Sequence, residues 1–277
     1  MNNKYPPFSI LMSVYDAENP VFLDESIQSI IKNSVLPSEI VIVKDGCLND
    51  SLELVLKKYD SNPLFKIVGY EKNQGLGFAL NYGLEHCKYN LIARMDSDDL
   101  CFEERFKYQL DAFNNESSLS IVGSNIFEFI DNKNKIVSKR IVPEKNDQIL
   151  KYCKTRNPFN HPAVMFKKKD VLAVGGYKPF FRHEDYYLWY RMLKQGFSGY
   201  NVQTPLVFMR ISNHFYRRRG GFKAFSYRNK LNKIMLKDGF IGFGTYIKVF
   251  LLNLGNMLCP SFLRKKIHLK FLREANK

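Results

Sequence analysis

The sequence predicts an α/β fold with a mostly parallel central sheet flanked by helices, followed by a basic helical tail. Apolar runs of strand length alternate with segments of helical periodicity, which is the pattern of βαβ units. The charge is uneven, because residues 210–277 hold 16 Lys and Arg against 2 Asp and Glu, whereas residues 1–209 hold 26 against 25. We therefore predict a near-neutral α/β domain over 1–210 and a basic amphipathic tail over 211–277.

Four apolar runs in the N-terminal part have the length and composition of buried strands. They lie at residues 8–15, 39–45, 65–69 and 90–95. The intervening helices are predicted at residues 22–34, about 50–59 and about 77–87. Pro20 and Pro37 bound the first helix, and Asn49 or Asp50 can cap the second. Parallel strands with right-handed crossovers follow from this alternation.

The rest of the predicted domain is less regular. Its predicted elements are a helix at 103–114, strands at 120–130 and 135–142, a strand at 161–166, a short helix ending at Gly175, and a helix beginning near Arg182. The sequence Asp131-Asn-Lys-Asn134 is typical of a hairpin turn between the first two of these strands.

Acidic side chains gather where the fourth predicted strand ends. Asp96, Asp98 and Asp99 are three carboxylates within four residues, and Tyr15 and Asp45 end two of the other strands. Ligands bind beside the carboxyl ends of the strands in parallel sheets, so these groups are expected on one crevice. A divalent cation would relieve the repulsion, and hard oxygen ligands suit Mg²⁺ or Mn²⁺. A solvated acidic turn is the competing interpretation at this point.

Several functional classes lack support in the sequence. The five cysteines are scattered, odd in number and without a CxxC pair, which favours a reducing cytoplasm over a disulfide framework or a zinc site. There is no HExxH or GxSxG motif, and the polar residues 1–7 give no expectation of a cleavable signal peptide.

Three nucleotide-binding alternatives can be compared. Gly75-x-Gly77 hints at a dinucleotide loop, but Leu80 replaces the third glycine. A sugar nucleotidyltransferase is expected to have a glycine-rich loop after the first strand, whereas residues 16–20 contain no glycine. A glycosyltransferase needs metal-binding carboxylates for a diphosphate and a separate base for the acceptor hydroxyl.

Seven motifs support the third alternative. In chain order they are Ser13-Val-Tyr15-Asp-Ala-Glu18, Val43-Lys-Asp45-Gly46, Asn73-x-Gly75 with Ala79-x-Asn81-x-Gly83, Ala93-Arg94-Met-Asp96-Ser-Asp98-Asp99, His161-Pro-Ala-Val-Met165, Gly175-Gly-Tyr177, and Glu184-Asp185-Tyr-Tyr-Leu-Trp189. Each motif is modest alone, but their order is specific. The chain resembles inverting glycosyltransferases of family 2, which have the Rossmann-like GT-A fold, and among them the bacterial surface-polysaccharide enzymes.

The resemblance implies roles on the donor side. Tyr15 matches the aromatic residue near the donor base, Asp45 the carboxylate that hydrogen-bonds the uracil, and Glu18 a residue that faces the donor. Asp96-x-Asp98 matches the DxD motif, with Asp98 as the direct ligand of Mn²⁺ or Mg²⁺ and Asp96 nearer the ribose and the metal. The sequence departs from the family pattern beside these residues, at Lys44 among others, which puts some donor contacts in doubt.

On the acceptor side, the resemblance implies that Asp185 is the general base and Glu184 its acidic neighbour. A helix-start carboxylate stabilised by the helix dipole is the structural alternative. Arg94 can either balance the acidic cluster or approach a phosphate, and Asp99 can either support the metal site or cap a helix. Single displacement with an α-linked nucleotide sugar would give a β-linkage.

The tail after residue 210 predicts two helices. Arg217-Arg-Arg219 precedes a helical segment at 222–237, and residues 240–258 are mostly apolar with Lys248 as the one charge. This span approaches the roughly 20 residues that cross a bilayer, but its glycines favour an interfacial anchor on anionic lipid, continued by the basic segment 262–271. A helix pair packed on the domain, with a solvated basic face, is the alternative.

The resemblance, together with the predicted anchor, implies a set of expected partners. We expect a UDP-sugar donor carrying a hexose, with UDP-glucose, UDP-galactose and UDP-N-acetylhexosamine all open, and a sugar acceptor on undecaprenyl diphosphate. The protein is expected at the cytoplasmic face of the cell membrane, peripherally attached. A nucleic-acid-binding protein is the competing class, because basic and aromatic residues also bind phosphates. It does not explain the acidic crevice, so no nucleic-acid partner is expected.

Overall fold

Four parallel strands form the part of the sheet that the N-terminal apolar runs predict. In the computed structural model, the described residues are 5–180, 182–212, 221–260, 263–264, 267 and 273–275. The four strands are β1 (Phe8–Val14), β2 (Glu39–Asp45), β3 (Phe65–Tyr70) and β4 (Leu91–Asp96). Strand β1 lies between β2 and β4, and β3 follows β2. Their carboxyl ends therefore meet along one end of the sheet.

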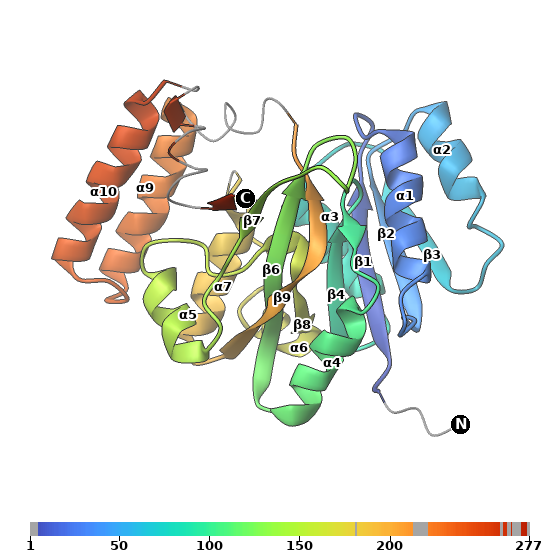
Figure 1. The fold of residues 1–277 in the computed structure, drawn as a ribbon, viewed down its shortest axis with the longest axis horizontal. Helices are drawn as coiled ribbons and strands as arrows, with labels where there is room; N and C mark the ends of the chain where they lie inside the picture. The colour runs from blue at the N-terminus through green and yellow to red at the C-terminus, as the bar shows by residue number, and fades with distance from the viewer. Residues whose placement is uncertain are drawn as a thin grey trace.

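Helices cover both faces of this sheet (Figure 1). One face buries α1 (Pro20–Ile31), α2 (Asp50–Lys57) and α4 (Arg105–Asn115), and the other buries α3 (Leu76–His86) and α7 (Glu184–Lys194). Asn19 begins α1 by accepting a hydrogen bond from the Val21 amide at 2.8 Å, and Asn49 accepts one from Leu52 at the start of α2. The α/β class with a parallel centre is therefore confirmed.

Beyond β4, the sheet continues with strands in mixed directions. They are β8 (Met165–Lys167), β6 (Leu119–Phe129), β7 (Ile136–Arg140) and β10 (Glu274–Ala275), in that spatial order. The predicted hairpin between β6 and β7 is confirmed, and Asp131 in its turn has a φ of 58°. A long strand, β9 (Ser198–Arg210), pairs with β6 and with the short β5 (Leu100–Cys101). Pro205 inside β9 weakens its sequence signal, and no strand was predicted there.

The predicted strand at 161–166 is wrong over its first half. Residues His161–Ala163 form a 3₁₀ helix, and pairing in the sheet begins only at Met165. Pro162 has a fixed φ and no amide hydrogen, so it suits a helical turn better than a sheet ladder. The remaining helices of this part are α5 (Asn146–Cys153) and α6 (Lys168–Ala173).

The tail forms two helices beside the domain (Figure 1), α9 (Phe222–Lys237) and α10 (Phe243–Leu258). Helix α9 buries Leu231 and Met235 in the core that α7 shares, whereas the only buried residue of α10 is Val249. No helix among the described residues has the length and apolar content needed to cross a membrane. The predicted basic residues 217–219 and most of the segment 262–271 lie outside the described residues.

Candidate active site

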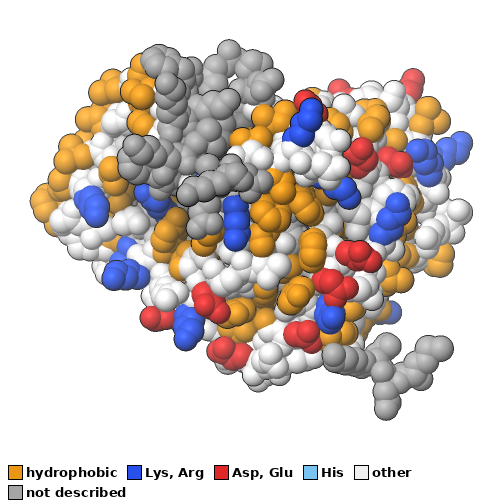
Figure 2. Space-filling view, in the orientation of Figure 1, with side chains coloured by type: hydrophobic (Ala, Val, Ile, Leu, Met, Phe, Trp, Pro, Cys, Tyr) orange, Lys and Arg blue, Asp and Glu red, His pale blue; other side chains and the backbone are white. Residues whose placement is uncertain are grey.

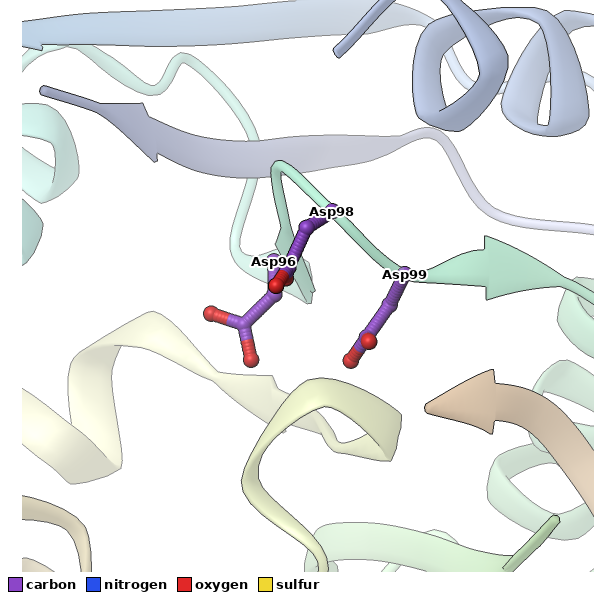
Figure 3. Close-up of side chains that lie close together, drawn as sticks. All are labelled: Asp96, Asp98 and Asp99. Atoms are coloured by element: carbon purple, nitrogen blue, oxygen red, sulfur yellow. The ribbon is translucent and has the colours of Figure 1, made fainter. Parts of the chain in front are cut away.

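The loop that follows β4 brings three carboxylates together. Asp96 is the last residue of β4, and Asp98 and Asp99 follow it. One carboxylate oxygen from each lies within 4.8 Å of the others, and all three side chains project to the same side of the loop (Figure 3). Asp96 and Asp98 are partly exposed, whereas Asp99 is buried. The carboxylates that are neighbours in sequence are therefore also neighbours in space.

Burial and mutual repulsion disfavour full ionisation of this cluster. Burial, followed by the negative charges of Asp96 and Glu18, raises the pKa of Asp98 to about 7. Burial and the charge of Asp98 raise the pKa of Asp99 well above its usual range. A bound cation would reverse this effect by stabilising the carboxylates.

The donor set fits a hard divalent cation. Carboxylate oxygens are the ligands that Mg²⁺ and Mn²⁺ prefer, and the partly exposed Asp96 and Asp98 can each offer one. Asp99 points the same way, and its Oδ2 atom is buried without a hydrogen-bond partner among the described residues. Its other oxygen accepts a hydrogen bond from the Arg210 amide at 2.7 Å. Asp99 therefore joins the acidic loop to the end of β9.

Arg94 holds Asp96 from the buried side. The guanidinium is 1% exposed and forms an ion pair with the Asp96 carboxylate. The Nε and Nη1 atoms of Arg94 are buried and have no hydrogen-bond partner in the described part of the chain. Of the two sequence interpretations of Arg94, this contact favours the one in which it balances the acidic cluster. The hydroxyl of Ser26 also donates to the Asp96 carbonyl oxygen at 3.0 Å.

The β1–α1 loop adds Glu18 and Tyr15 to this region. Glu18 accepts a hydrogen bond from the Ser97 hydroxyl at 2.8 Å, and its charge acts on Asp98. The structure therefore places Glu18 beside the acidic loop, although 78 or more residues separate them in sequence. Tyr15 directly follows β1 and is 47% exposed.

Asp45, at the end of β2, organises the loop that begins α3. Its Oδ1 atom accepts hydrogen bonds at 2.8 Å from the Tyr70 hydroxyl and from the Gln74 amide, and its Oδ2 accepts one from the Gly75 amide at 3.0 Å. Gly46 has a φ of 91°, and a Cβ there would lie 2.7 Å from the Asn73 nitrogen. Asp45 is 5% exposed. Its predicted hydrogen bond with uracil would therefore need a carboxylate lone pair that these three bonds do not use.

Glu184 and Asp185 are the first two residues of α7, and they come much later in the chain than the acidic loop. Asp185 accepts a hydrogen bond from the Asn157 side-chain amide at 2.6 Å, and Arg140 contributes a positive charge. Burial raises the pKa of Asp185, whereas the Tyr186 amide, Asn157 and Arg140 oppose that rise. Burial also raises the pKa of Glu184. Burial outweighs these opposing contacts, so the pKa of Asp185 lies above its usual value.

Two buried side chains link the two acidic regions. The charge of Arg94 acts on Asp96 and also on Asp185. Both of these carboxylates act in turn on the Tyr177 hydroxyl, and burial raises the pKa of Tyr177 above its usual range. Tyr177 also lies 3.0 Å from His161 Nε2. The acidic loop and Asp185 therefore both lie within electrostatic range of Arg94 and Tyr177.

Sequence reasoning missed the residues that position the acidic groups from a distance. Besides its amide bond to Asp99, Arg210 donates from Nε to the Asp98 carbonyl oxygen at 3.0 Å and forms an ion pair with Glu25 at 2.7 Å. Arg210 is 112 residues from Asp98 in sequence. Asn157 is 28 residues before Asp185 and belongs to none of the recognised motifs. No local signal marks either residue.

Comparison with known proteins defines the class. A family model described as Glycosyl transferase family 2 matches residues 9–175. The fold also matches a solved structure of the mannosyltransferase PcManGT from Pyrobaculum calidifontis in complex with GDP-Man and Mn²⁺. That match has a TM-score of 0.66 and 12% sequence identity, and it covers 93% of this chain and 71% of the other. The fold is therefore the GT-A fold.

Two curated relatives narrow the comparison. The chain is 38% identical, over 99% of both chains, to an Escherichia coli UDP-Gal:alpha-D-GlcNAc-diphosphoundecaprenol beta-1,3-galactosyltransferase. It is 34% identical to the Erwinia amylovora amylovoran biosynthesis glycosyltransferase AmsE, over 91% of this chain and 94% of the other. The chain belongs to glycosyltransferase family 2. It is a glycosyltransferase that resembles bacterial enzymes of surface-polysaccharide synthesis.

Proposed function

We propose that the protein transfers a hexose from a UDP-sugar to a sugar acceptor on undecaprenyl diphosphate, with inversion, in bacterial surface-polysaccharide synthesis. Galactose is the first donor sugar to test, because the Escherichia coli relative is named for UDP-Gal and a diphosphoundecaprenol acceptor. The observation that carries the proposal is the pair of acidic regions, Asp96 with Asp98 and Asp185, around the shared Arg94 and Tyr177.

The donor lies on the first of these regions in this proposal. Tyr15 stacks near the uracil, Asp45 holds the loop against which the base lies, and Glu18 and Asp96 face the ribose. Asp98 and Asp96 hold Mn²⁺ or Mg²⁺, which when bound supplies positive charge to the departing diphosphate. Arg94 keeps Asp96 in place from the buried side.

Asp185 acts as the base on the other side of the sugar. It takes the proton of the acceptor hydroxyl as the new bond forms, because a carboxylate with a low ordinary pKa is a weak base before that point. Asn157 orients the carboxylate through its 2.6 Å hydrogen bond. Attack from the face opposite the diphosphate inverts the anomeric carbon, so an α-linked donor gives a β-linked product.

The substitution Asp185→Asn tests this proposal. Loss of the base is expected to lower transfer by about 10²–10⁴-fold, with the dissociation constant for UDP in the presence of Mn²⁺ within about twofold of the parent protein. Asp147→Asn is the matched control, because Asp147 is an exposed carboxylate in the first turn of α5. Unchanged transfer by Asp185→Asn, with intact donor binding, would remove the assigned base.

The tail belongs to the same proposal as a peripheral anchor at the cytoplasmic face of the membrane. Residues 210–277 carry a net charge of +14, and apolar side chains are exposed on α10. Basic residues beside an exposed apolar helix face are typical of attachment to anionic lipid. Flotation with anionic vesicles but not with neutral vesicles is the expected result. Salt-dependent binding to nucleic acid, without vesicle binding, would contradict it.

A further inference from the structure

Helix α9 extends from the core toward the end of α7 that carries Asp185. Near the start of α7, the Tyr186 hydroxyl accepts a hydrogen bond from Arg228 Nη2 at 3.2 Å. Near the end of α7, Lys194 forms an ion pair at 2.9 Å with Asp238, which follows α9. The two helices therefore run in the same direction. Residues of α9 that precede Arg228 lie beyond the start of α7, on the side of the base.

A groove lies between this N-terminal half of α9 and α10. Helix α10 runs in the opposite direction to α9, because Asn232 bonds to Tyr246 and Asn229 to Asn253. The groove has a volume of about 350 Å³, within the range of about 300–1,000 Å³ that small-molecule sites occupy. Its lining consists of Phe222, Phe225, Ser226, Asn229, Lys230, Lys233 and Phe250.

The lining combines aromatic surface with positive charge. The rings of Phe225 and Phe250 lie 5.7 Å apart, and Phe222 is 75% exposed. Lys230 and Lys233 are both exposed on the same side of α9. Aromatic surface beside lysines fits a ligand that has an apolar part and an anionic part.

Phe180 connects the groove to the catalytic region. Its ring lies 4.8 Å from that of Tyr187 in α7 and 5.9 Å from that of Tyr227 in α9, and Lys230 lies 5.7 Å from its centre. Phe180 is five residues before Asp185. The side chain of Phe180 therefore lies between the groove residue Lys230 and the first turns of α7.

We propose that this groove binds the diphosphate and the first isoprenyl units of the acceptor lipid. The inference rests on the proposed function and adds the site for the part of the acceptor that does not react. Lys230 and Lys233 pair with the diphosphate, and Phe222, Phe225 and Phe250 pack on the isoprenyl chain. Its distal units then pass along the exposed apolar face of α10. Figure 2 shows hydrophobic side chains on the edge of the molecule that α10 forms. The large hydrophobic side chains that are exposed on α10 are Phe243, Ile247, Leu251, Leu252 and Leu258.

The charge balance of the tail agrees with this occupant. A sugar diphosphate lipid carries negative charge only at its head, and Lys230 brings positive charge of the groove to within 5.7 Å of the ring of Phe180, which packs against Tyr187 of α7. A neutral partner would leave Lys230 and Lys233 without a role, and an extended polyanion would leave the phenylalanines without one. The amphiphilic chemistry of a polyprenyl diphosphate matches both.

Two variants test the groove in detergent micelles, where no bilayer is present. Phe225→Ser with Phe250→Ser removes the aromatic walls, and Lys230→Gln with Lys233→Gln removes the charges. Each is assayed with the same acceptor sugar on undecaprenyl diphosphate and on a short alkyl chain without phosphate. The expected result is a fall of about tenfold in the ratio of kcat/KM for the lipid acceptor to kcat/KM for the short one. Lys237→Gln with Lys248→Gln is the control, because it removes two exposed charges from the same helices outside the groove.

Three outcomes would overturn the proposal. An unchanged ratio shows that the groove does not contact the lipid, and an equal loss on both acceptors shows a structural role only. If the control lowers the ratio as much as Lys230→Gln with Lys233→Gln, the effect is one of total charge. If the parent protein transfers no sugar to either acceptor, the proposed function fails separately. Direct binding of undecaprenyl diphosphate to the parent and not to the groove variants then still decides the inference.

Discussion

The two acidic regions, around Asp98 and around Asp185, differ in the charges that surround their buried carboxylates. Asp98 lies among other carboxylates, and both its burial and its neighbours Asp96 and Glu18 raise its pKa. Asp185 lies at the start of a helix, where Asn157 and the positive charge of Arg140 oppose the effect of burial. The repulsion around Asp98 can be relieved by a cation, whereas around Asp185 a hydrogen bond and positive charges already offset part of the effect of burial. The proposed reaction, with a metal on the donor and a base on the acceptor, uses both kinds of environment.

The largest difference between the regions is expected from Asp98→Asn. Removal of this proposed metal ligand should lower transfer by at least about 10²–10³-fold and weaken Mn²⁺ binding measured by calorimetry. The same change should stabilise the fold when a chelator is present. The raised pKa means that the folded protein holds its proton more tightly than the unfolded chain, so the charged form costs stability above about pH 4 and most above about pH 7.

The stability part of this prediction is measured by thermal unfolding at pH 8 with a chelator. A rise of roughly 2 °C or more is expected for Asp98→Asn, because about 1 kcal/mol shifts the melting temperature by roughly 2–4 °C in a protein of this size. Asp147→Asn, at an exposed carboxylate, should leave the melting temperature unchanged. A marked fall for Asp98→Asn would mean that its carboxylate has a structural partner and that the comparison is wrong.

A smaller effect is expected from Arg210→Met, which loosens the acidic loop without removing a carboxylate. The variant loses the hydrogen bond to the Asp98 carbonyl and the ion pair with Glu25. We expect kcat/KM to fall about tenfold and the Mn²⁺ concentration for half-maximal rate to rise, because bonds to a charged group contribute about 1.5–3 kcal/mol. Arg156→Met is the control at an exposed arginine. An unaltered Mn²⁺ requirement would show that Arg210 does not position the loop.

The smallest effect is a shift in pH dependence from Asn157→Ala. The hydrogen bond from Asn157 stabilises the ionised Asp185, so its loss should raise the pKa of that carboxyl. The base works only when it has lost its proton, and the acidic limb of kcat/KM should therefore move to higher pH by about 0.5–1 unit. Asn114→Ala, on the exposed side of α4, should leave the limb in place. Movement to lower pH would contradict the assignment.

The N-terminal half of the fold was predictable because its signals are local. Each strand of the parallel part is a continuous apolar run, and Asn49 caps α2 as expected. The hairpin turn at Asp131 and the boundaries of α9 also followed from neighbouring residues. Strand β9 was missed because Pro205 and polar residues interrupt it, and its pairing with β6 joins segments about 80 residues apart.

By itself, the sequence determined which chemical groups the protein has: an acidic loop after a buried strand, a carboxylate pair at a helix start, and a basic tail. These depend on residue type and short spacing, which the chain carries locally. Only the tertiary structure decided their environments. Arg210 below Asp99, Asn157 beside Asp185 and α9 beside α7 join residues that are distant in the chain. Such contacts arise from packing two faces of one sheet, and no local pattern specifies them.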